Sequence, residues 1–404
     1  MLTRRGRLVL ALGAGVYVAA WAFGSKPLYP VAVGLVLAVG FAWAWVRMRN
    51  KPMQLTRAVW GAEHVEGDDV PVNLELTVEG RFVPASLPIA DTIPGLSSVE
   101  VVVRRAGRRL TGRYVIQAVP RGRYPFGESH AILEDPFGLE RTDVSLPASG
   151  AMLVYPRLTE LERLFSESGA HGHGGRRLLL RRPSGFDLHS VRDYEQGDSL
   201  RNVHWRSTAR RGQLMVKDLE DAPRDEVAVL LDAAAGEVGT RPDSSFDMQV
   251  RAAGSILATH ARRGRQAVLV VNSLLRETEH LRSGGGDWRR VLELLAAAEP
   301  SGRMSVSALL GEDSSPAGRA LELTIVTAQL SPGLVDRLVL RSLNRRGVSL
   351  VYVDLATFAN PPRQRREPLL LRLEAAGVSV AVLRRGDELG VKLGQRVIEA
   401  SASG

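Results

Sequence analysis

The first fifty residues carry two uncharged apolar runs with a short turn between them. The runs are Leu8–Phe23 and Val31–Val46, each sixteen residues long, and the turn is Gly24–Pro30. A helix needs roughly 20 apolar residues to span a bilayer, and Leu28 and Tyr29 can lengthen the second run. The pattern predicts a helical hairpin in a membrane.

Basic residues give this hairpin a direction. The turn holds only Lys26, whereas the outer flanks hold Arg4, Arg5, Arg7, Arg47, Arg49 and Lys51. Because positive flanks stay in the cytoplasm, we expect a two-helix hairpin over residues 1–51 of a multi-pass cell-membrane protein, with both termini and the soluble domains cytoplasmic. A cleaved signal peptide is the alternative, since Ala20-Trp21-Ala22 resembles a cleavage site. The second apolar run directly behind that site argues against export.

The next part of the chain follows a period of two. Apolar and polar residues alternate from Val70 to Val78, which is the pattern of a half-buried strand. The segments Val99–Val103 and Tyr114–Ala118 repeat the pattern, and Pro and Gly interrupt the sequence between them. We therefore predict a small antiparallel β-sandwich-like domain over residues 52–160.

Two turn-rich phrases in this region could bind a ligand or could simply shape loops. They are Arg121-Gly122-Arg123-Tyr124 and Asp135-Pro136-Phe137-Gly138-Leu139. Pro fixes φ and Gly permits positive φ, so we favour the structural interpretation for both phrases.

The remainder alternates short apolar runs with segments of helical period. We predict strands over 227–232, 266–271, 321–328, 348–354 and 378–383, and helices over 244–264, 287–298, 332–345 and 366–376. Such alternation implies right-handed crossovers and a doubly wound parallel sheet, so the fold class is α/β plus β. Residues 184–404 form this α/β part. Residues 161–183 are a predicted flexible linker, in which His171 and His173 lack the carboxylates or thiols of a metal site.

The composition changes this picture little. The 404 residues fit two or three domains, and 45% hydrophobic with 24% charged residues suits packed domains. The net charge of +9 suggests an anionic partner, but only four of the 53 basic residues are lysine. That bias is typical of a GC-rich genome, and we do not expect nucleic-acid binding. Cysteine is absent, which excludes disulfides, thiolate metal sites and cysteine nucleophiles.

Doubly wound sheets bind ligands at the carboxyl ends of their strands. The chain lacks the loop motifs that bind nucleotides or carry a nucleophilic serine at this position. No G-x-G-x-x-G follows the first strand, and neither G-x-x-x-x-G-K-[ST] nor G-x-S-x-G occurs. Nucleotide binding by such loops and serine hydrolase chemistry lose their support. We expect no cofactor and no enzymatic activity.

The densest phrase of the chain, residues 184–212, lies just before the first of these strands. It resembles the signature R-x-Y-x-x-G-D-x-x-R-x-I-H-W-x-x-[ST]-A-[RK] of the domain-of-unknown-function-58 family. Val203 stands in place of the usual Ile, and the other positions are filled by Arg192, Tyr194, Gly197, Asp198, Arg201, His204, Trp205, Thr208, Ala209 and Arg210. The two turn-rich phrases and the hairpin also look like this family, so the resemblance covers nearly the whole chain.

The resemblance implies a membrane-anchored protein with a von Willebrand factor A-like α/β domain. Members of the family are typically encoded beside MoxR-type AAA+ ATPases, often with a transglutaminase-like membrane protein. They are thought to act with the ATPase in assembling or maturing other proteins, and no enzymatic activity is established for them. The expected partner is therefore a MoxR-type AAA+ ATPase, with a transglutaminase-like membrane protein as a second candidate.

The signature residues allow three interpretations. Its arginines can pair with Asp193 and Asp198 in a clasp that holds the sandwich against the α/β domain. Alternatively, the same arginines and Trp205 form a protein-docking surface. Catalysis is the third interpretation, although His204 has no evident nucleophile beside it. The residues of the clasp or docking surface are Arg192, Tyr194, Gly197, Asp198, Arg201, His204, Trp205 and Arg210.

The α/β part has lost most of the metal motif that the resemblance implies. A metal-binding A domain needs Asp-x-Ser-x-Ser after the first strand, with Thr and Asp from later loops. This chain reads Asp232-Ala233-Ala234-Ala235-Gly236 there, and Gln329-Leu330-Ser331 after the strand 321–328. We therefore predict no metal and regard Asp232 as the remnant of the motif, capping the next turn.

Three functions remain open. The leading hypothesis is a non-enzymatic, membrane-anchored scaffold that presents an A-like domain to a MoxR-type AAA+ ATPase. The alternative is a membrane-proximal binder of anionic lipid or polymer through clusters such as Arg176, Arg177, Arg181 and Arg182. A hydrolase is the third, and the sequence shows no constellation of residues that would support it.

Overall fold

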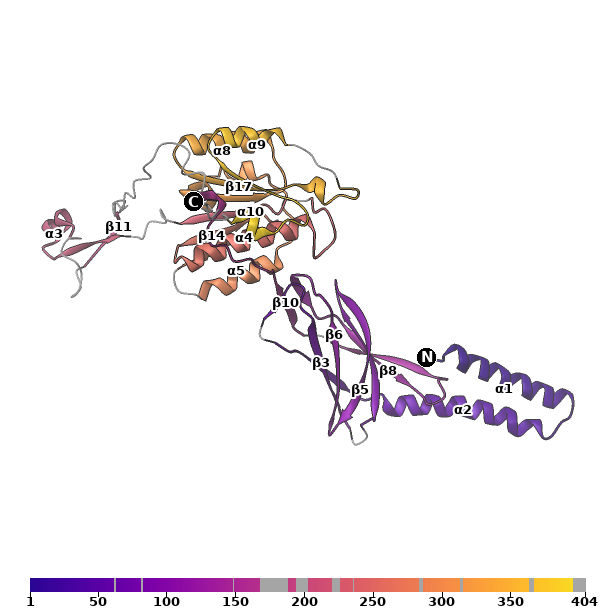
Figure 1. Cartoon of the computed structure of the whole chain (residues 1–404). Coiled ribbons are helices and arrows are strands. Elements are labelled where there is room, and N and C mark those ends of the chain that lie inside the picture. The colour runs from indigo at the N-terminus through magenta and orange to yellow at the C-terminus, as the bar shows by residue number, and fades with distance from the viewer. Residues whose placement is uncertain are drawn as a thin grey trace, which may run out of the picture. The chain divides into compact units, whose positions relative to one another are not determined.

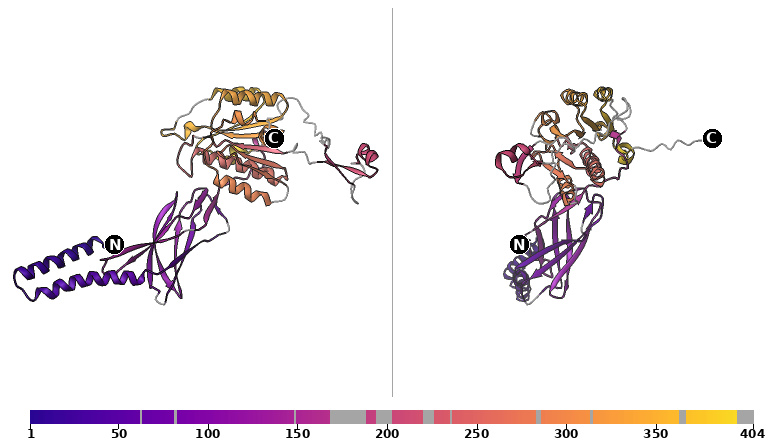
Figure 2. Two further views of the ribbon diagram at one scale, coloured as in Figure 1. Left: turned by 180° about the vertical axis from the view of Figure 1, so that it is seen from behind. Right: turned by 90° about the vertical axis from the view of Figure 1, so that its left-hand side faces the viewer.

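The computed structural model describes residues 1–61, 63–80, 83–147, 149–167, 188–193, 203–219, 226–234, 236–282, 286–312, 315–362 and 367–394. The chain divides into two compact units, Met1–Tyr155 and Pro156–Gly404. Figure 1 colours the chain from indigo at its start to yellow at its end, and Figure 2 shows it from two other sides. Each unit has its own hydrophobic core.

Two adjacent helices open the first unit, α1 (Arg4–Ala22) and α2 (Leu28–Arg49). They lie side by side in Figures 1 and 2, and a Cβ on Gly13 of α1 would lie 3.2 Å from Leu35 Cβ of α2. A glycine at this position lets the two backbones approach closely. α2 is long and apolar enough to cross a membrane, which agrees with the membrane prediction for this segment.

The rest of the first unit consists of two sheets. A seven-stranded antiparallel sheet has the order β1-β3-β6-β5-β4-β8-β9, and a three-stranded sheet has the order β2-β10-β7. The strands are β1 (Met53–Val59), β2 (His64–Val65), β3 (Val70–Val78), β4 (Ser86–Ile93), β5 (Ser97–Ala106), β6 (Arg109–Ile116), β7 (Gly122–Pro125), β8 (Ser129–Glu134), β9 (Arg141–Leu146) and β10 (Ala151–Tyr155). The three segments of period two lie on β3, β5 and β6, which confirms the predicted antiparallel sheet.

Alternation along the strands builds the core of this unit. Every second residue of β3, from Val70 to Val78, is buried, as a period of two requires. Tyr124 of β7 and Val154 of β10 pack into the same core, so both sheets contribute to it.

A charged pair lies buried in the interior of this unit. Arg57 of β1 donates from Nε and Nη2 to Asp91 Oδ1 of β4 at 2.9 and 2.7 Å. The hydroxyl of Tyr114 donates to Asp91 Oδ2 at 2.7 Å, and the hydroxyl of Ser129 donates to Oδ1 at 2.5 Å. The side chains of Arg57 and Asp91 are only 2% and 0% exposed. A buried pair of this kind depends on every one of its partners.

The network keeps Asp91 ionised. Burial alone would raise the pKa of Asp91, but hydrogen bonds from Arg57, Ser129 and Tyr114 outweigh burial and hold this pKa below its usual value of 3.8. Burial, together with the Asp91 carboxylate, raises the pKa of Tyr114. The pKa of Asp91 is lower in the folded chain than in the unfolded chain. The contribution of Asp91 to folding stability is therefore complete above the unfolded pKa and is lost as the pH falls through the folded pKa.

The Asp135–Leu139 phrase forms the loop between β8 and β9. Asp135 Oδ1 accepts from the backbone N–H of Leu139 at 2.7 Å and of Glu140 at 2.6 Å, and Oδ2 accepts from Phe137 N–H at 2.8 Å. Leu139 in turn packs against α2. The carboxylate therefore shapes the loop and fixes it beside the helices, which is the structural role favoured from the sequence.

The second unit holds a six-stranded sheet of order β15-β14-β13-β16-β17-β18. β15 pairs antiparallel with β14, and the other neighbours pair in parallel. The strands are β13 (Val227–Leu231), β14 (Ala267–Val271), β15 (Thr278–Leu281), β16 (Glu322–Thr327), β17 (Gly347–Val353) and β18 (Ser379–Leu383). The five predicted strands correspond to β13, β14, β16, β17 and β18, and the short antiparallel β15 was missed.

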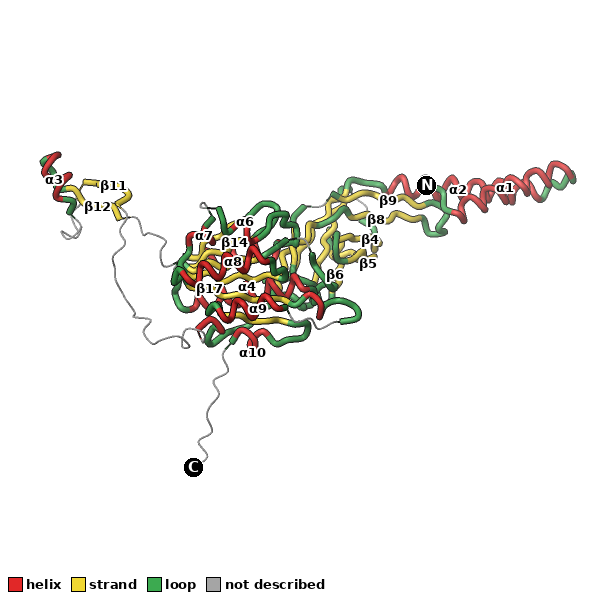
Figure 3. Tube along the Cα trace, turned by 90° about the horizontal axis from the view of Figure 1, so that it is seen from above, coloured by secondary structure: helices red, strands yellow, loops and turns green. Residues whose placement is uncertain are grey.

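Helices cover both faces of this sheet, as the view from above in Figure 3 shows. Side chains of Val227, Val229 and Leu231 share one core with helices α4 (Ser245–Arg262), α5 (Gly286–Ala297) and α10 (Leu389–Leu393). Ala228 and Leu230 share the opposite core with α6 (Val306–Leu309), α7 (Pro316–Arg319), α8 (Pro332–Leu343) and α9 (Pro368–Ala375). Successive residues of a strand point to opposite faces, so β13 is apolar at every position.

The boundaries of this unit differ from the prediction at its start. Leu161 and Leu164 are buried in the core beneath α4, and a short 3₁₀ helix, η1, spans Phe165–Glu167. Residues 161–167 therefore belong to the packed unit rather than to the predicted linker 161–183, because their apolar side chains complete its core. The rest of that linker, with His171 and His173, lies outside the described residues.

Candidate functional site

The structure describes part of the signature phrase. β11 (Leu188–Asp193) pairs antiparallel with β12 (Met215–Leu219), with Arg192 opposite Val216. Helix α3 (Trp205–Arg211) lies between the two strands in sequence and contacts β12. Of the eight residues assigned to a clasp or docking surface, the described ones are Arg192, His204, Trp205 and Arg210. The other four lie outside the described residues: Tyr194, Gly197, Asp198 and Arg201.

His204 caps the start of α3. Its Nδ1 accepts from Ser207 N–H at 3.2 Å and pairs with the Ser207 hydroxyl at 2.8 Å. The backbone N–H of His204 donates to Met215 O at 2.8 Å, and Met215 N–H donates to Thr208 Oγ1 at 3.0 Å. These bonds join the helix to β12. The Nδ1 of His204 is therefore occupied by a helix cap rather than by a reacting group.

Trp205 and Arg210 differ from His204 in their exposure. Trp205, the first residue of α3, is 68% exposed, and Arg210 in the last turn is exposed as well. Arg206 and Arg211 are exposed on the same short helix. α3 is thus a capped helix that exposes a large aromatic side chain and three arginines to solvent.

A second group of polar side chains meets at the carboxyl ends of three neighbouring central strands. Asp232 follows β13, Asn272 follows β14 and Thr327 ends β16, and all three are buried. The Thr327 hydroxyl donates to Asp232 Oδ2 at 2.6 Å, and Asn272 Nδ2 donates to Oδ1 at 3.2 Å. Ala234 N–H also donates to Oδ1, at 3.1 Å, so Asp232 caps the turn after β13.

This strand-end cluster is closed by protein atoms. Both carboxylate oxygens of Asp232 already accept hydrogen bonds, and Gly302 packs so closely that a Cβ on it would lie 2.0 Å from the Asn272 carbonyl oxygen. Among the described residues, no three His, Asp or Glu side chains gather in a way that could hold a metal ion. These hydrogen bonds order the carboxyl ends of the three strands, while Asn272 Oδ1 accepts no hydrogen bond from the described residues.

The comparison with protein families supports the signature. A family model described as "Protein of unknown function DUF58" matches residues 190–357, from β11 to the short 3₁₀ helix η5 (Leu355–Thr357). Residues 190–357 belong to the DUF58 family. The matched region contains the described signature residues from Arg192 onward and the whole strand-end cluster, so both groups lie in the DUF58 region itself.

Similar proteins add little about the chemistry of this DUF58 chain. It is 24% identical over 332 residues to "Uncharacterized protein YeaD" of Bacillus subtilis (strain 168), covering 79% of this chain and 80% of that protein. BslA, a bacterial hydrophobin, covers 26% of this chain and 100% of its own at 14% identity and a TM-score of 0.16. Cwp6 from Clostridium difficile covers 74% of this chain and 49% of its own at 7% identity and a TM-score of 0.17. Such TM-scores carry no argument about fold or function.

Sequence reasoning found Asp232 in this DUF58 protein but missed its two partners. Both partners lie at strand ends. Asn272 directly follows the buried run Ala267–Val271, and Thr327 ends β16, the strand on the other side of β13. In a parallel sheet, polar residues at the carboxyl ends of adjacent strands lie together. Recognising the cluster required the order of the strands, which the sequence did not supply.

A buried histidine of this unit gives it an acid-sensitive stability. His260 of α4 is 2% exposed, and burial, with help from Arg265 and Arg263, lowers its pKa from 6.5 to about 4. The neutral form is therefore favoured in the fold, whereas the unfolded chain takes up a proton below pH 6.5. The stabilisation is complete above the unfolded pKa and is lost as the pH falls from 6.5 towards the folded value.

We expect a fall from about pH 7 to about pH 5 to lower the unfolding free energy of the second unit by about 2 kcal/mol through His260. Hydrogen exchange of β13 and β14 in the full chain measures this change. His260→Leu should remove most of this pH dependence, whereas His280→Gln, at an exposed histidine paired with Glu226 at 2.7 Å, should keep it. Equal pH dependence in the wild type and the His260 variant would contradict the assignment.

Proposed function

We propose that this DUF58 protein is a non-enzymatic, membrane-anchored scaffold that presents its α/β domain to a MoxR-type AAA+ ATPase. Its role would be the assembly or maturation of other proteins. The family resemblance supplies the partner, and a transglutaminase-like membrane protein is a second candidate partner. The observation that carries the proposal is the exposed Trp205 on the capped helix α3.

Exposed apolar surface supports anchoring by both N-terminal helices. Contiguous apolar patches of this extent are unfavourable in water and mark membrane or protein contacts. Arg47 lies over the Trp43 ring at 5.5 Å and Arg49 over the Trp45 ring at 5.2 Å, as at a membrane interface. The exposed large apolar side chains of α1 and α2 include Leu8, Leu10, Leu12, Tyr17, Val18, Trp21, Val31, Val33, Val36, Leu37, Phe41 and Trp43.

The orientation follows from the basic flanks. With arginines at the start of α1 and at the end of α2, we infer a two-helix hairpin with both ends and both soluble parts in the cytoplasm. A cytoplasmic position is also what an interaction with a cytoplasmic ATPase requires.

The order of the six strands supports an A-like domain. Numbered along the chain from β13, the sheet has the order 3-2-1-4-5-6, which is a doubly wound order, and its third strand is antiparallel. We infer a von Willebrand factor A-like domain, preceded by a β-sandwich made of the two sheets of the first unit. Because the Asp232 carboxylate is engaged by protein donors, we propose that this domain acts as a metal-independent docking module.

Trp205 has the properties of a binding hot spot. Tryptophan and arginine dominate the energetics of many protein interfaces, where a large aromatic ring fills a pocket of the partner. In this chain the ring is exposed on the same short helix as Arg206 and Arg210, while the His204 cap and the Thr208 contact with Met215 hold that helix in place. Such a surface is pre-organised for a partner.

We expect Trp205→Ala to reduce recovery of the ATPase from solubilised membranes by about tenfold, because a central aromatic anchor is lost. Co-purification with the tagged full-length chain measures the effect. Trp60→Ala is the matched control, since Trp60 is 70% exposed but lies on the first unit, outside the signature. Full recovery with Trp205→Ala would refute docking through α3. Failure of the wild-type chain to recover any AAA+ ATPase would refute the proposed partner.

Binding of anionic lipid or polymer is the second candidate function, favoured by the three exposed arginines of α3. Counter-ion release would make such binding weaken steeply with salt. Because an aromatic hot spot contributes little to it, this function predicts equal binding by the wild type and Trp205→Ala. The effect of Trp205→Ala therefore distinguishes the two functions: ATPase docking predicts a loss of binding, and binding of anionic lipid or polymer predicts none.

A further inference from the structure

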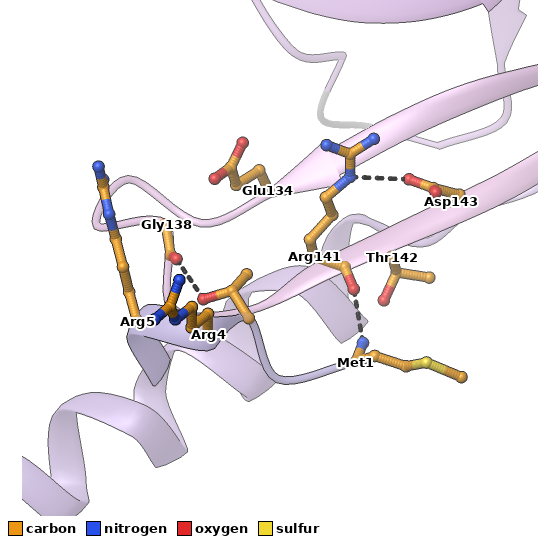
Figure 4. A pocket seen from close by; sticks show the side chains of 9 residues that line it. Met1, Arg4, Arg5, Glu134, Gly138, Arg141, Thr142 and Asp143 are labelled. Carbon is orange, nitrogen blue, oxygen red and sulfur yellow. Dashed lines mark hydrogen bonds and ion pairs between the residues drawn. The ribbon is translucent and has the colours of Figure 1, made fainter. Parts of the chain in front are cut away.

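An open hollow of about 860 Å³ lies beside the first turn of α1, within the first unit. Its lining comes from the start of the chain and from β8, β9 and the loop between them, as Figure 4 shows from close by. The residues that matter for its chemistry are Arg4, Arg5, Glu134, Gly138, Arg141 and Asp143.

Hydrogen bonds from Thr3 fix the frame of this hollow. Thr3 Oγ1 donates to Gly138 O at 2.7 Å, and Thr3 N–H donates to Leu139 O at 3.0 Å, so the start of α1 is held to the loop that Asp135 shapes. Gly138 has a φ of +67°, a conformation that favours glycine. A Cβ there would lie 3.0 Å from Glu134 Oε1, so the glycine also leaves this side of the hollow open.

Two arginines in the hollow are free to bind an anion. Arg141 is engaged, because its Nε donates to Asp143 Oδ1 at 3.1 Å. In the part of the chain that the structure describes, Arg4 and Arg5 pair with no carboxylate, and Figure 4 draws no side-chain contact from either. Glu134 is the remaining carboxylate of the lining. The unpaired charge of the hollow is therefore positive.

The hollow lies where α1 enters its apolar run. That run begins at Leu8, four residues after Arg4, which corresponds to a rise of about 6 Å along a helix. The polar headgroup layer of a bilayer is roughly 5–8 Å deep on each side. In an anchored hairpin, the guanidinium groups of Arg4 and Arg5 therefore lie at the depth of the lipid phosphates.

We propose that this hollow binds the phosphodiester headgroup of an anionic phospholipid, with Arg4 and Arg5 as the phosphate contacts. The inference rests on the proposed membrane anchoring. Guanidinium groups bind phosphate oxygens through paired, charge-assisted hydrogen bonds. A soluble phosphate ester offers the same chemistry, but the acyl chains of a lipid can also cover the exposed Leu8 and Leu12 of α1. The observations therefore favour a lipid as the source of the phosphate.

The test uses the full-length chain in detergent, titrated with short-chain phosphatidylglycerol, with bound lipid counted by native mass spectrometry. We expect the double variant Arg4→Gln/Arg5→Gln to bind this lipid at least about tenfold more weakly. Glu134→Gln should bind it about twofold more tightly, because a carboxylate that opposes the phosphate is removed. The two variants change affinity in opposite directions, which a general loss of folding cannot do.

The matched control is Arg47→Gln/Arg49→Gln, which removes two charges from the same side of the hairpin, where they stack on tryptophans. It should retain phosphatidylglycerol binding. Equal losses in both double variants would overturn the site in favour of general charge attraction. Wild-type binding of phosphatidylcholine or glycerol phosphate as tight as that of phosphatidylglycerol would overturn the anionic lipid as ligand.

Failure of the anchor is measured separately. Alkaline extraction of cell membranes reports whether the wild-type chain is integral, and Arg7 with the α2 flank should keep the double variant there. A chain that is extracted from membranes but still binds phosphatidylglycerol in detergent would refute the anchoring proposal and leave the site intact. An integral chain that binds no phosphatidylglycerol would refute the site alone.

Discussion

Replacing Asp91 with alanine should destabilise the first unit by about 3–5 kcal/mol, because the substitution leaves a buried guanidinium without its counter-ion. Arg57 is 2% exposed and cannot turn to water without opening the core. The hydroxyl groups of Tyr114 and Ser129 would also lose their acceptor. A buried donor left without a partner carries a further cost.

Hydrogen exchange of the full-length chain measures this effect strand by strand. Amides of β3, β4 and β6 should lose protection, whereas those of β13 in the second unit serve as an internal control. The double variant Arg57→Met/Asp91→Leu is the matched comparison, because replacing both members of a buried pair by apolar residues is often neutral. If the single and double variants lose the same protection, the unpaired charge is not the cause.

The burial of Arg57 and Asp91 could have been predicted from the alternation of apolar residues in the sequence. Arg57 lies on the same face of β1 as Met53, Leu55 and Val59, which pack on the core. Asp91 likewise continues a buried row on β4, formed by Leu87, Ile89 and Ile93. A charge at an inward position of a strand predicts a buried partner, since an isolated buried charge is very unfavourable. Which strand supplies the partner depends on the order of the sheet, and that order is not encoded in any local pattern.

The second unit was easier to predict because its central strands are uninterrupted apolar runs and its longer helices show a clear helical period. The predicted helix 244–264 corresponds to α4, where the Ser244 hydroxyl accepts from Asp247 N–H at 3.0 Å as an N-cap. The antiparallel strand β15 was missed because four residues are too few to show a period. Local patterns thus predict elements, whereas contacts between distant strands decide the strand-end cluster.

The candidate site was predicted less completely than the fold. His204 stood out in the sequence as a chemical group, but only its contacts with Ser207 identify it as a helix cap. Trp205 stood out as part of a docking surface, and only the structure gives the exposure of its side chain. A residue type gives the chemistry that is available, while burial and hydrogen-bond partners decide how it is used.

Asp232→Ala should destabilise the second unit by about 2–4 kcal/mol, because it removes the acceptor of two buried side chains and of one backbone N–H. The Thr327 hydroxyl donates to Asp232 at only 2.6 Å, and Asn272 Nδ2 keeps just its bond to Met304 O at 2.7 Å. The matched control is Asp354→Ala at the end of β17. Asp354 is equally buried, but its Oδ1 accepts from Ala356 N–H at 3.2 Å and its Oδ2 lies 3.8 Å from the half-exposed Arg384 Nε, so we expect a loss of about 1 kcal/mol.

The same pair of variants tests whether Asp232 is a structural residue or a metal ligand. Hydrogen exchange at Asn272, whose N–H donates to Leu231 O at 2.9 Å, reports the order of the strand ends directly. A structural Asp232 predicts equal protection of the wild type with Mg²⁺ and with a chelator, because its carboxylate oxygens are satisfied by protein donors. Protection that rises with Mg²⁺ in the wild type but not in Asp232→Ala would make this carboxylate a ligand after all, and the docking surface of the domain would then have to be sought at the strand ends rather than on α3.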